Sequence, residues 1–119
     1  MNRLLIVDDA LIMRMKIRQL AEAAGWTVVA EAKNGAEAVK LFSEHAPDMV
    51  TLDMVMPEMD GLAALKAIRA ANGQAQVVMV SAVDQKEKLK ECISSGAMDF
   101  IVKPFDDARL KEFFERYRS

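Results

Sequence analysis

The stretch Leu4-Leu5-Ile6-Val7-Asp8-Asp9 places two carboxylates directly after four consecutive aliphatic residues. A short, uninterrupted aliphatic run predicts a β-strand that is buried on both faces, as in a parallel sheet. Three further runs have the same form: residues 49–52 precede Asp53, residues 77–80 precede Ser81, and residues 100–102 precede Lys103. Each run is therefore predicted to be a buried strand that ends in a reactive polar group.

Apolar residues at helical spacing separate these runs. Five helices are predicted. The first covers residues 13–24, and the second begins after a cap at Asn34, with Glu37 three residues on, and ends before Pro47. The others cover 61–71, 85–95, and the segment from Asp106-Asp107 to Tyr117. A weaker strand at residues 28–30 completes five strand–helix units. We therefore predict an α/β fold, with a five-stranded parallel sheet that is doubly wound and forms one domain over residues 1–119. Right-handed crossovers bring all the carboxyl ends of the strands to one edge, where ligands of such sheets bind.

Composition narrows the class of protein. A chain of 119 residues with 52% hydrophobic residues can bury a core, and its net charge of −2 gives no general reason to bind nucleic acid or an anionic membrane. No apolar run approaches the roughly 18 residues that a membrane span needs. The single cysteine, Cys92, excludes an intrachain disulfide and is predicted to lie in the core. These features favour a cytoplasmic protein.

The predicted edge would bring Asp8, Asp9 and Asp53 together. Two unit charges about 4 Å apart repel by about 4 kcal/mol at an effective dielectric constant near 20, so three carboxylates need protons or cations. Lys103 supplies one positive charge, and an all-oxygen ligand set favours Mg²⁺ for the remainder. Such a site is typical of phosphoryl transfer. Asp53 suits an in-line nucleophile, while Ser81 and Lys103 suit contacts to phosphoryl oxygens.

The order of these motifs resembles the response-regulator receiver domains of two-component signalling over essentially the whole chain. The matching features are Asp8-Asp9, Asp53, Met56-Pro57 with Met59-Asp60-Gly61, Ser81-Ala82, and Lys103-Pro104-Phe105. The resemblance implies a flavodoxin-like strand order of 2-1-3-4-5, and a Lys103-Pro104 bond that is often cis in relatives. Within the family, the runs at residues 10–15 and 99–105 most resemble standalone chemotaxis proteins of the CheY type.

The resemblance also implies a set of roles. Asp53 would accept a phosphoryl group from a phosphohistidine on a sensor kinase, of CheA type, in a Mg²⁺-dependent reaction. Asp9, Asp53 and the backbone carbonyl of Val55 would bind the metal, with Asp8 assisting through water. The chain would assist its own phosphorylation and dephosphorylation without being an enzyme acting on a separate substrate.

Signalling in relatives follows from a change of surface. The Ser81-type hydroxyl moves toward the phosphate, and an aromatic residue at the position of Phe100 turns inward. The surface of the fourth helix, fifth strand and fifth helix then changes its preference for a downstream protein, which for a chemotaxis protein would be a flagellar motor switch. The resemblance further implies a monomer that contacts neither nucleic acid nor membrane directly.

Two positions depart from common family patterns. Phe100 has no hydroxyl, so packing alone would set its two orientations. Val55 and Val83 lie two residues after Asp53 and Ser81, and neither side chain can hydrogen-bond the water that hydrolyses an acyl phosphate. We therefore predict a comparatively long-lived phosphorylated state.

The sequence argues against two rival classes of protein. A phosphatase of the haloacid-dehalogenase type would carry a second aspartate where Val55 stands, and a flavin carrier would carry a Ser/Thr/Gly-rich loop where Asp8-Asp9-Ala10 stands. A receiver-like interaction module that is never phosphorylated is a third reading. A phosphorelay intermediate, or a receiver excised from a larger regulator, is the alternative within the family. Away from the site, Trp26 is predicted to be a half-buried cover residue.

Overall fold

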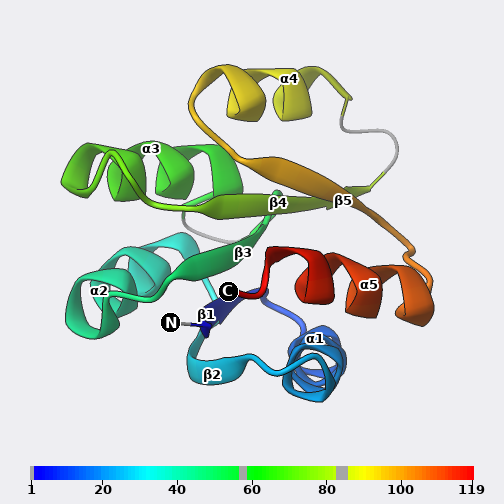
Figure 1. Cartoon of the computed structure of the whole chain (residues 1–119). Helices are drawn as coiled ribbons and strands as arrows, with labels where there is room; N and C mark the ends of the chain where they lie inside the picture. The colour runs from blue at the N-terminus through cyan, green and yellow to red at the C-terminus, as the bar shows by residue number, and fades with distance from the viewer. Residues whose placement is uncertain (1, 57–58, 83–85) are drawn as a thin grey trace.

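Five parallel strands form the centre of the protein. The computed structural model describes residues 2–56, 59–82 and 86–119, and orders the strands β2-β1-β3-β4-β5 (Figure 1). The strands are β1 (Arg3–Val7), β2 (Thr27–Ala32), β3 (Met49–Asp53), β4 (Val77–Ala82) and β5 (Asp99–Lys103). The predicted α/β class and the implied strand order are both confirmed.

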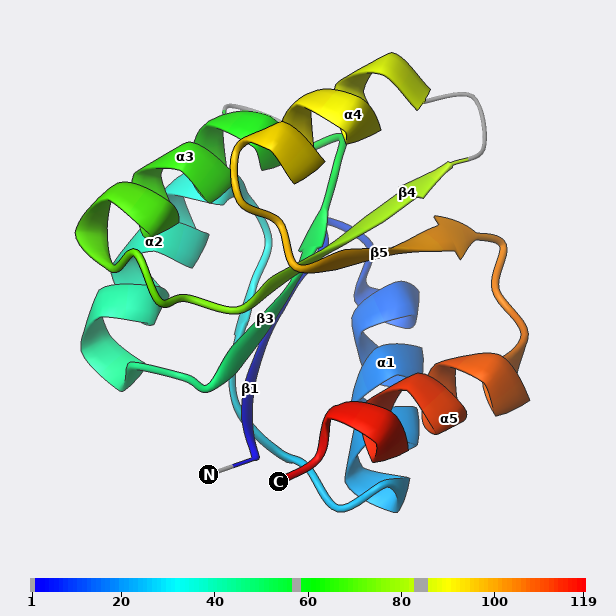
Figure 2. The ribbon, with the colours of Figure 1, turned by 45° about the horizontal axis from the view of Figure 1, so that its top comes forward.

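Helices cover both faces of the sheet. They are α1 (Leu11–Ala23), α2 (Gly35–His45), α3 (Gly61–Ala71), α4 (Lys86–Ser94) and α5 (Asp107–Tyr117). Helices α1 and α5 pack together on one face, and α2, α3 and α4 follow one another across the other face (Figures 1 and 2). In the part of the chain that the structure describes, no helix combines the length and the apolar character that a bilayer crossing would need.

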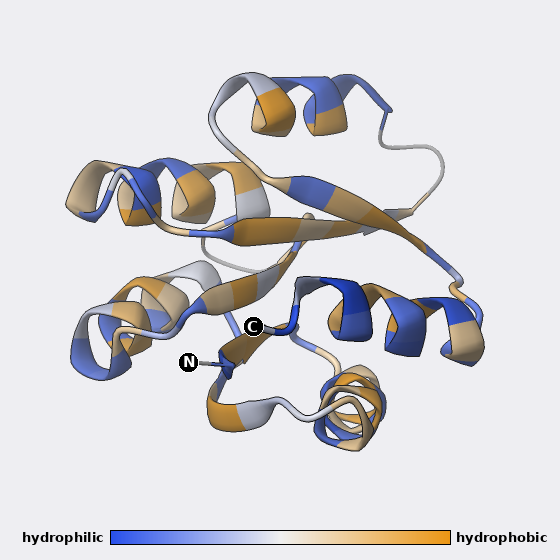
Figure 3. Cartoon of the chain, viewed as in Figure 1, coloured by the Kyte–Doolittle hydropathy of each residue, from blue (hydrophilic) through white to orange (hydrophobic). Residues whose placement is uncertain are grey.

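The alternation of side chains along the strands divides the core into two layers. Leu5, Val7 and Leu52 belong to the cluster beneath α2, α3 and α4, whereas Leu4 and Ile6 belong to the cluster beneath α1 and α5. Coloured by hydropathy, the inner strands are mainly hydrophobic, while polar and apolar residues alternate along the helices (Figure 3). This is the pattern of a sheet buried on both faces.

Strand register places the predicted site residues along one edge. Val7 pairs with Leu52, Asp53 with Val80, and Ser81 with Val102 across successive neighbouring strands. Because all strands run in the same direction, the residues that follow these pairs leave the sheet at the same edge. Sequence position and parallel pairing together are enough to gather the polar groups.

Side-chain caps set where several helices begin. Asn34 accepts a hydrogen bond from the N–H of Glu37, as predicted, but the Glu37 carboxylate reaches the N–H of Lys33 rather than that of the cap residue itself. Asp60 caps α3, and Asp106 caps α5. Each cap satisfies a backbone donor that the helix leaves unpaired. The predicted starts at 61 and behind 106 are therefore confirmed, and α4 is observed from Lys86, since Gln85 lies outside the described residues.

Three predictions about apolar residues are wrong. The run 100–102 forms a strand as predicted, but β5 lies at the edge of the sheet, so Phe100 and Val102 are 44% and 38% exposed rather than buried. Trp26 is buried rather than half-buried, because its ring packs against Phe114 and its Nε1 donates a 2.8 Å hydrogen bond to the Phe114 carbonyl. In the helix predicted over 85–95, helical spacing puts Ile93 on the same face as Leu89, but Ile93 is 44% exposed. The inner face of that helix is carried by Cys92, which is fully buried as predicted, and by Leu89.

The two ends of the chain meet at the edge opposite the predicted site. Oδ1 of Asn2 accepts hydrogen bonds from the Ser119 N–H at 2.8 Å and from the Ser119 hydroxyl at 2.9 Å. A turn at Asn72-Gly73 lies between α3 and β4, where Oδ1 of Asn72 accepts a hydrogen bond from the N–H of Gln74. The sheet edge that carries the acids is thus free of both termini.

Candidate functional site

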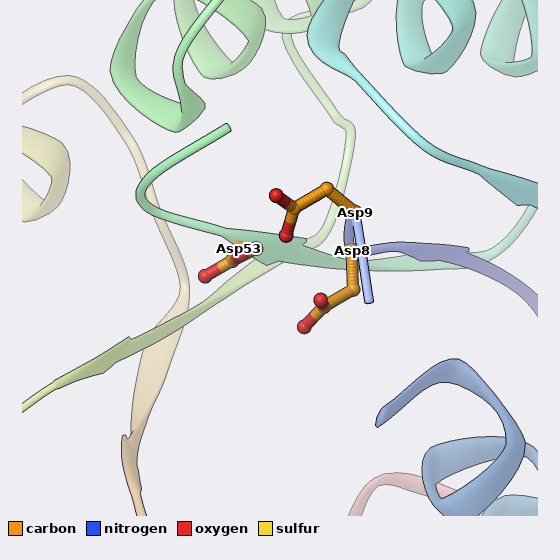
Figure 4. A group of neighbouring side chains, drawn as sticks. All are labelled: Asp8, Asp9 and Asp53. Carbon is orange, nitrogen blue, oxygen red and sulfur yellow. The ribbon is translucent and has the colours of Figure 1, made fainter. Parts of the chain in front are cut away.

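Three carboxylates gather at the carboxyl ends of the two neighbouring strands β1 and β3. Oxygens of Asp8, Asp9 and Asp53 all lie within 4.8 Å of one another, and their side chains project from the adjacent strand ends into a shared space (Figure 4). Asp8 and Asp53 are buried, whereas Asp9 is exposed at the rim. The convergence of acids predicted from the sequence is therefore present.

Lys103 enters the cluster from the end of β5. Its Nζ donates to Oδ2 of Asp8 at 2.9 Å and to Oδ1 of Asp53 at 3.3 Å. Burial by itself would lower the pKa of Lys103, but the hydrogen bond to Asp8 and the charges of both carboxylates outweigh it and hold that pKa above its ordinary value. The ammonium group is therefore charged and bridges the two buried acids.

Asp53 has a pKa well above the ordinary range of an aspartate. Burial and the negative charge of Asp8 raise its pKa to about 6, against the opposing effect of Lys103. The attraction of Lys103 therefore does not offset the combined effect of burial and of the neighbouring acid on Asp53. At neutral pH the carboxylate is ionised in a site that still has an excess of negative charge.

The donor set tests whether a divalent cation fits this place. The three carboxylates offer oxygen atoms and no nitrogen or sulfur, which suits a hard cation such as Mg²⁺. The spacing of the oxygens and the uncompensated charge at Asp53 agree with that choice. The residues present therefore fit the cation that the sequence predicted.

The backbone N–H, the backbone carbonyl and the carboxylate of Asp8 all make hydrogen bonds. Its N–H donates to the Ala32 carbonyl at 3.1 Å, and its Oδ1 accepts from the N–H of Ala10 at 2.9 Å. Its own carbonyl accepts from Nη1 of Arg14 at 2.6 Å. Arg14 was missed by the sequence analysis, although a charge three residues before Ile17 on the buried side of a helix was an available signal.

Ser81 lies at the end of β4 with an unpaired hydroxyl. Its Oγ is buried and, among the described residues, has no hydrogen-bond partner. Burying a hydroxyl without a partner is unfavourable, so the group is available to an acceptor that enters the site. Thr51, two residues before Asp53 on β3, is also buried, and its hydroxyl likewise has no hydrogen-bond partner among the described residues.

The remaining predicted site residues lie at the rim or on the outer surface. Val55 is 54% exposed in the loop that follows β3, and Val83 lies outside the described residues. Phe100 is 44% exposed on β5, and the Lys103-Pro104 bond is cis. Pro57, part of the predicted Met56-Pro57 motif, also lies outside the described residues.

Phe100 borders a hollow between α4 and β5. This hollow has a volume of about 530 Å³ and is lined by Lys86, Leu89, Lys90, Ile93, Ser94 and Phe100. A second, more polar hollow of about 770 Å³ runs between β5 and α5. The surface formed by α4, β5 and α5, which the family resemblance implies to be the output surface, thus has one hollow on each side of β5.

Comparison with known proteins identifies the family and agrees with the fold. The response regulator receiver domain family matches residues 4–115. The chain belongs to this family. It is 51% identical over 111 residues to the chemotaxis protein CheY of Bacillus subtilis, covering 93% of this chain and 92% of that protein.

A solved structure and a longer relative add to this likeness. The CheX–CheY–BeF₃–Mg²⁺ complex from Borrelia burgdorferi contains a chain that is 37% identical, with a TM-score of 0.88, covering 92% of this chain and 84% of that one. A probable C4-dicarboxylate response regulator, DctR of Priestia megaterium, is 40% identical over 116 residues, covering 98% of this chain and 51% of the longer protein. The chain is therefore a CheY-like member of the receiver family.

Proposed function

We propose that this protein is a phosphoacceptor response regulator that receives a phosphoryl group on Asp53 from the phosphohistidine of a sensor kinase. The observation that carries the proposal is the placement of Asp53. It is buried at a sheet edge, 3.3 Å from a lysine and within reach of two further acids, in a chain of the receiver family. Such a site combines a nucleophile with a fixed positive charge.

The proposed transfer needs few groups from the protein. A carboxylate oxygen of Asp53 attacks phosphorus in line with the phosphohistidine nitrogen, so that a P–O bond forms as the P–N bond breaks. The electron pair of the broken bond stays on the imidazole nitrogen. Lys103 is already within hydrogen-bond distance of Asp53, and its ammonium group stabilises the charge on the phosphoryl oxygens without a large movement.

A bound divalent cation would neutralise the negative charge of the acid cluster and of the phosphoryl group. Asp9, Asp53 and the backbone carbonyl of Val55 would hold it, with Asp8 assisting through water. The crowding of the three carboxylates and the raised pKa of Asp53 support this ligand set. Mg²⁺ is therefore part of the proposal.

The signal is proposed to leave the site through Ser81 and Phe100. The buried and unpaired Ser81 hydroxyl can donate to a phosphoryl oxygen on Asp53. Phe100 is half-exposed beside the hollow between α4 and β5, so its inward turn would reshape that hollow. The surface of α4, β5 and α5 would then bind a downstream protein with altered affinity.

Chemotaxis is the proposed pathway, supported by the likeness to CheY proteins over nearly the whole chain. The phosphodonor would be a kinase of CheA type and the target a flagellar motor switch or a CheX-like protein, as in the Borrelia burgdorferi complex. We propose a cytoplasmic monomer that assists its own phosphorylation and dephosphorylation. The single, buried cysteine agrees with a reducing compartment.

One alternative has an observation in its favour. The match to half of the longer regulator DctR shows that closely similar domains occur within larger proteins. A phosphorelay intermediate or an excised receiver would share the chemistry at Asp53 and differ in its output. A receiver-like interaction module that is never phosphorylated would differ in the chemistry itself.

The experiment that tests the proposal is intact-mass measurement after incubation with acetyl phosphate, with and without Mg²⁺. Wild type is expected to gain one phosphoryl group only with Mg²⁺, and Asp53→Asn is expected to gain none. Asp106→Asn is the matched control, because it removes a carboxylate that caps α5 while asparagine can still cap the helix. An absence of any gain in wild type would favour the interaction module.

A further inference from the structure

Arg14 is a charged side chain in a buried position. It lies on α1 in the same buried stripe as Ile17 and Ala21, and only 8% of its surface is exposed. Arginine is rarely this buried unless its guanidinium is paired, because an unpaired buried charge is strongly unfavourable. The partners of Arg14 therefore indicate what this position requires.

Those partners come from two different strands. Nη1 donates to the main-chain carbonyl of Asp8 at the end of β1, and Nε donates to Oε1 of Glu31 on β2 at 3.0 Å. The other oxygen of Glu31 accepts from Nε of Arg18, one turn further along α1, at 2.8 Å. Two arginines thus share one carboxylate, and of these two, Arg14 is the one that contacts Asp8.

The carbonyl that Arg14 binds belongs to the peptide bond between Asp8 and Asp9. Since the peptide unit is planar, the direction of this carbonyl also sets the position from which the Asp9 side chain starts. The other polar groups of Asp8 are bound by Ala32, Ala10 and Lys103. Arg14 therefore holds the group that links the buried aspartate to the exposed one.

Asp9 has little else to hold it. Its side chain is exposed, and within residues 2–56, 59–82 and 86–119 its carboxylate makes neither a hydrogen bond nor an ion pair. Its distance from Asp53 consequently depends on the backbone that carries it. A change in the Asp8–Asp9 peptide would move one of the three oxygens that surround the proposed cation.

We propose that Arg14 is a positioning residue for the divalent cation, acting through the Asp8 carbonyl on the Asp9 carboxylate. Glu31 assists by fixing the plane of the guanidinium. The inference rests on the proposed function, since it takes the acid cluster to be the place where the cation binds. Groups that orient metal ligands from outside commonly change metal affinity by about 10- to 100-fold when they are removed.

Because Arg14 is positively charged, the direction of the change in Mg²⁺ affinity on its removal distinguishes positioning from a purely electrostatic effect. If Arg14 acted only through its positive charge, Arg14→Met would relieve repulsion and the cation would bind more tightly. If Arg14 positions Asp9, the same substitution misplaces a ligand and the cation binds more weakly. The two explanations therefore predict opposite changes in affinity.

The test is calorimetric titration of Mg²⁺ into the full chain. Arg14→Met is expected to raise the Mg²⁺ dissociation constant by about tenfold or more. Arg18→Met is the matched control, because it removes the same kind of charge and the second bond to Glu31 but no contact with Asp8. It is expected to stay within about twofold of wild type, since Arg18 makes no contact with the acid cluster and its partly exposed ion pair with Glu31 contributes little.

Each outcome bears on the proposal. Unchanged or tighter binding by Arg14→Met overturns it, and so does an equal loss in both variants, which would point to the anchoring of α1 on β2. Should Arg14→Met fail to fold, Arg14→Lys decides, because one ammonium cannot reproduce the fork that serves both partners. Wild-type affinity in Arg14→Lys would overturn the proposal, and tenfold weaker binding would support it. Failure of wild type itself to bind Mg²⁺ would remove the proposed function as well.

Discussion

The ammonium group of Lys103 lies closer to Asp8 than to the proposed acceptor: its Nζ is 2.9 Å from Oδ2 of Asp8 and 3.3 Å from Oδ1 of Asp53. Asp8 is also the more deeply buried of the two carboxylates. The lysine is therefore kept at the site by a residue that the reaction does not modify. We therefore expect the lysine to stay in place when Asp53 carries the proposed phosphoryl group.

Lys103→Met is expected to slow phosphorylation by acetyl phosphate by about 10²-fold, the usual effect of removing one charge-stabilising donor. The same substitution removes a positive charge from the acid cluster, so Mg²⁺ is expected to bind more tightly. Time courses by intact mass and calorimetric titration measure the two effects. Slower phosphorylation together with weaker Mg²⁺ binding would contradict this separation of roles.

Stability should depend on pH through Asp53 when divalent cations are chelated. Because the folded-state pKa of Asp53 is about 6 and the unfolded value is 3.8, the folded state holds the extra proton between these values. The free energy of unfolding is therefore expected to fall as pH rises from about 4 to about 7. Asp53→Asn should remove this loss, on the order of 3 kcal/mol at neutral pH.

Urea denaturation of wild type and Asp53→Asn at several pH values checks this prediction. The two curves should converge near the acid end, where wild-type Asp53 is already protonated in the folded state. Added Mg²⁺ should stabilise wild type more than the variant, because the cation needs the third carboxylate. A variant that is less stable than wild type at neutral pH in chelator would show that the sign is wrong.

Gly61→Ala should disturb the site through the backbone. A Cβ at Gly61 would collide with the carbonyl oxygen of Asp53 and lie 2.8 Å from the Cα of Met54. Since both contacts are backbone, the start of α3 or the end of β3 must shift, and a loss of about 1–3 kcal/mol is expected in denaturation experiments. Gly73→Ala is the control, because its Cβ would meet nothing within 4 Å. Equal stability of the two variants would rule out this close packing.

The lifetime of the phosphorylated state remains a prediction. Val55 is exposed at the rim of the site, where an apolar side chain offers no hydrogen bond to an attacking water. Val55→Asn with Val83→Glu is expected to speed the loss of the phosphoryl group, measured by intact mass after removal of acetyl phosphate. An unchanged decay rate in this double variant would end the hypothesis, and Val55→Leu serves as the apolar control.

Much of the site was predictable because residues at the carboxyl ends of parallel strands lie at the same edge of the sheet. Asp8, Asp53 and Ser81 each follow a buried run, whereas Lys103 follows the partly exposed edge strand β5. A common strand direction is enough to bring all four to one edge. Helix starts at Gly61 and Asp107 were predictable for a similar local reason, since the preceding aspartates are strong caps. These features depend on neighbours in the chain.

The features that sequence reasoning missed depend on contacts between distant segments. Trp26 is buried because α5 returns over it and offers the Phe114 carbonyl, 88 residues away. Arg14 is buried because β2 places Glu31 beside α1. Ile93 is exposed because Cys92 and Leu89 already fill the space under α4. No local pattern specifies which residue will meet such a partner.

The meeting of Asn2 and Ser119 has a practical consequence for engineering. Because these residues are hydrogen-bonded, a short linker could join the present ends, and new ends could be opened at Gly73, in a turn on the side of the sheet away from the acids. In such a circular permutant, the five strands would keep their places while their order along the chain changed. Reporter domains attached to either set of ends would leave the acid cluster open to its phosphodonor.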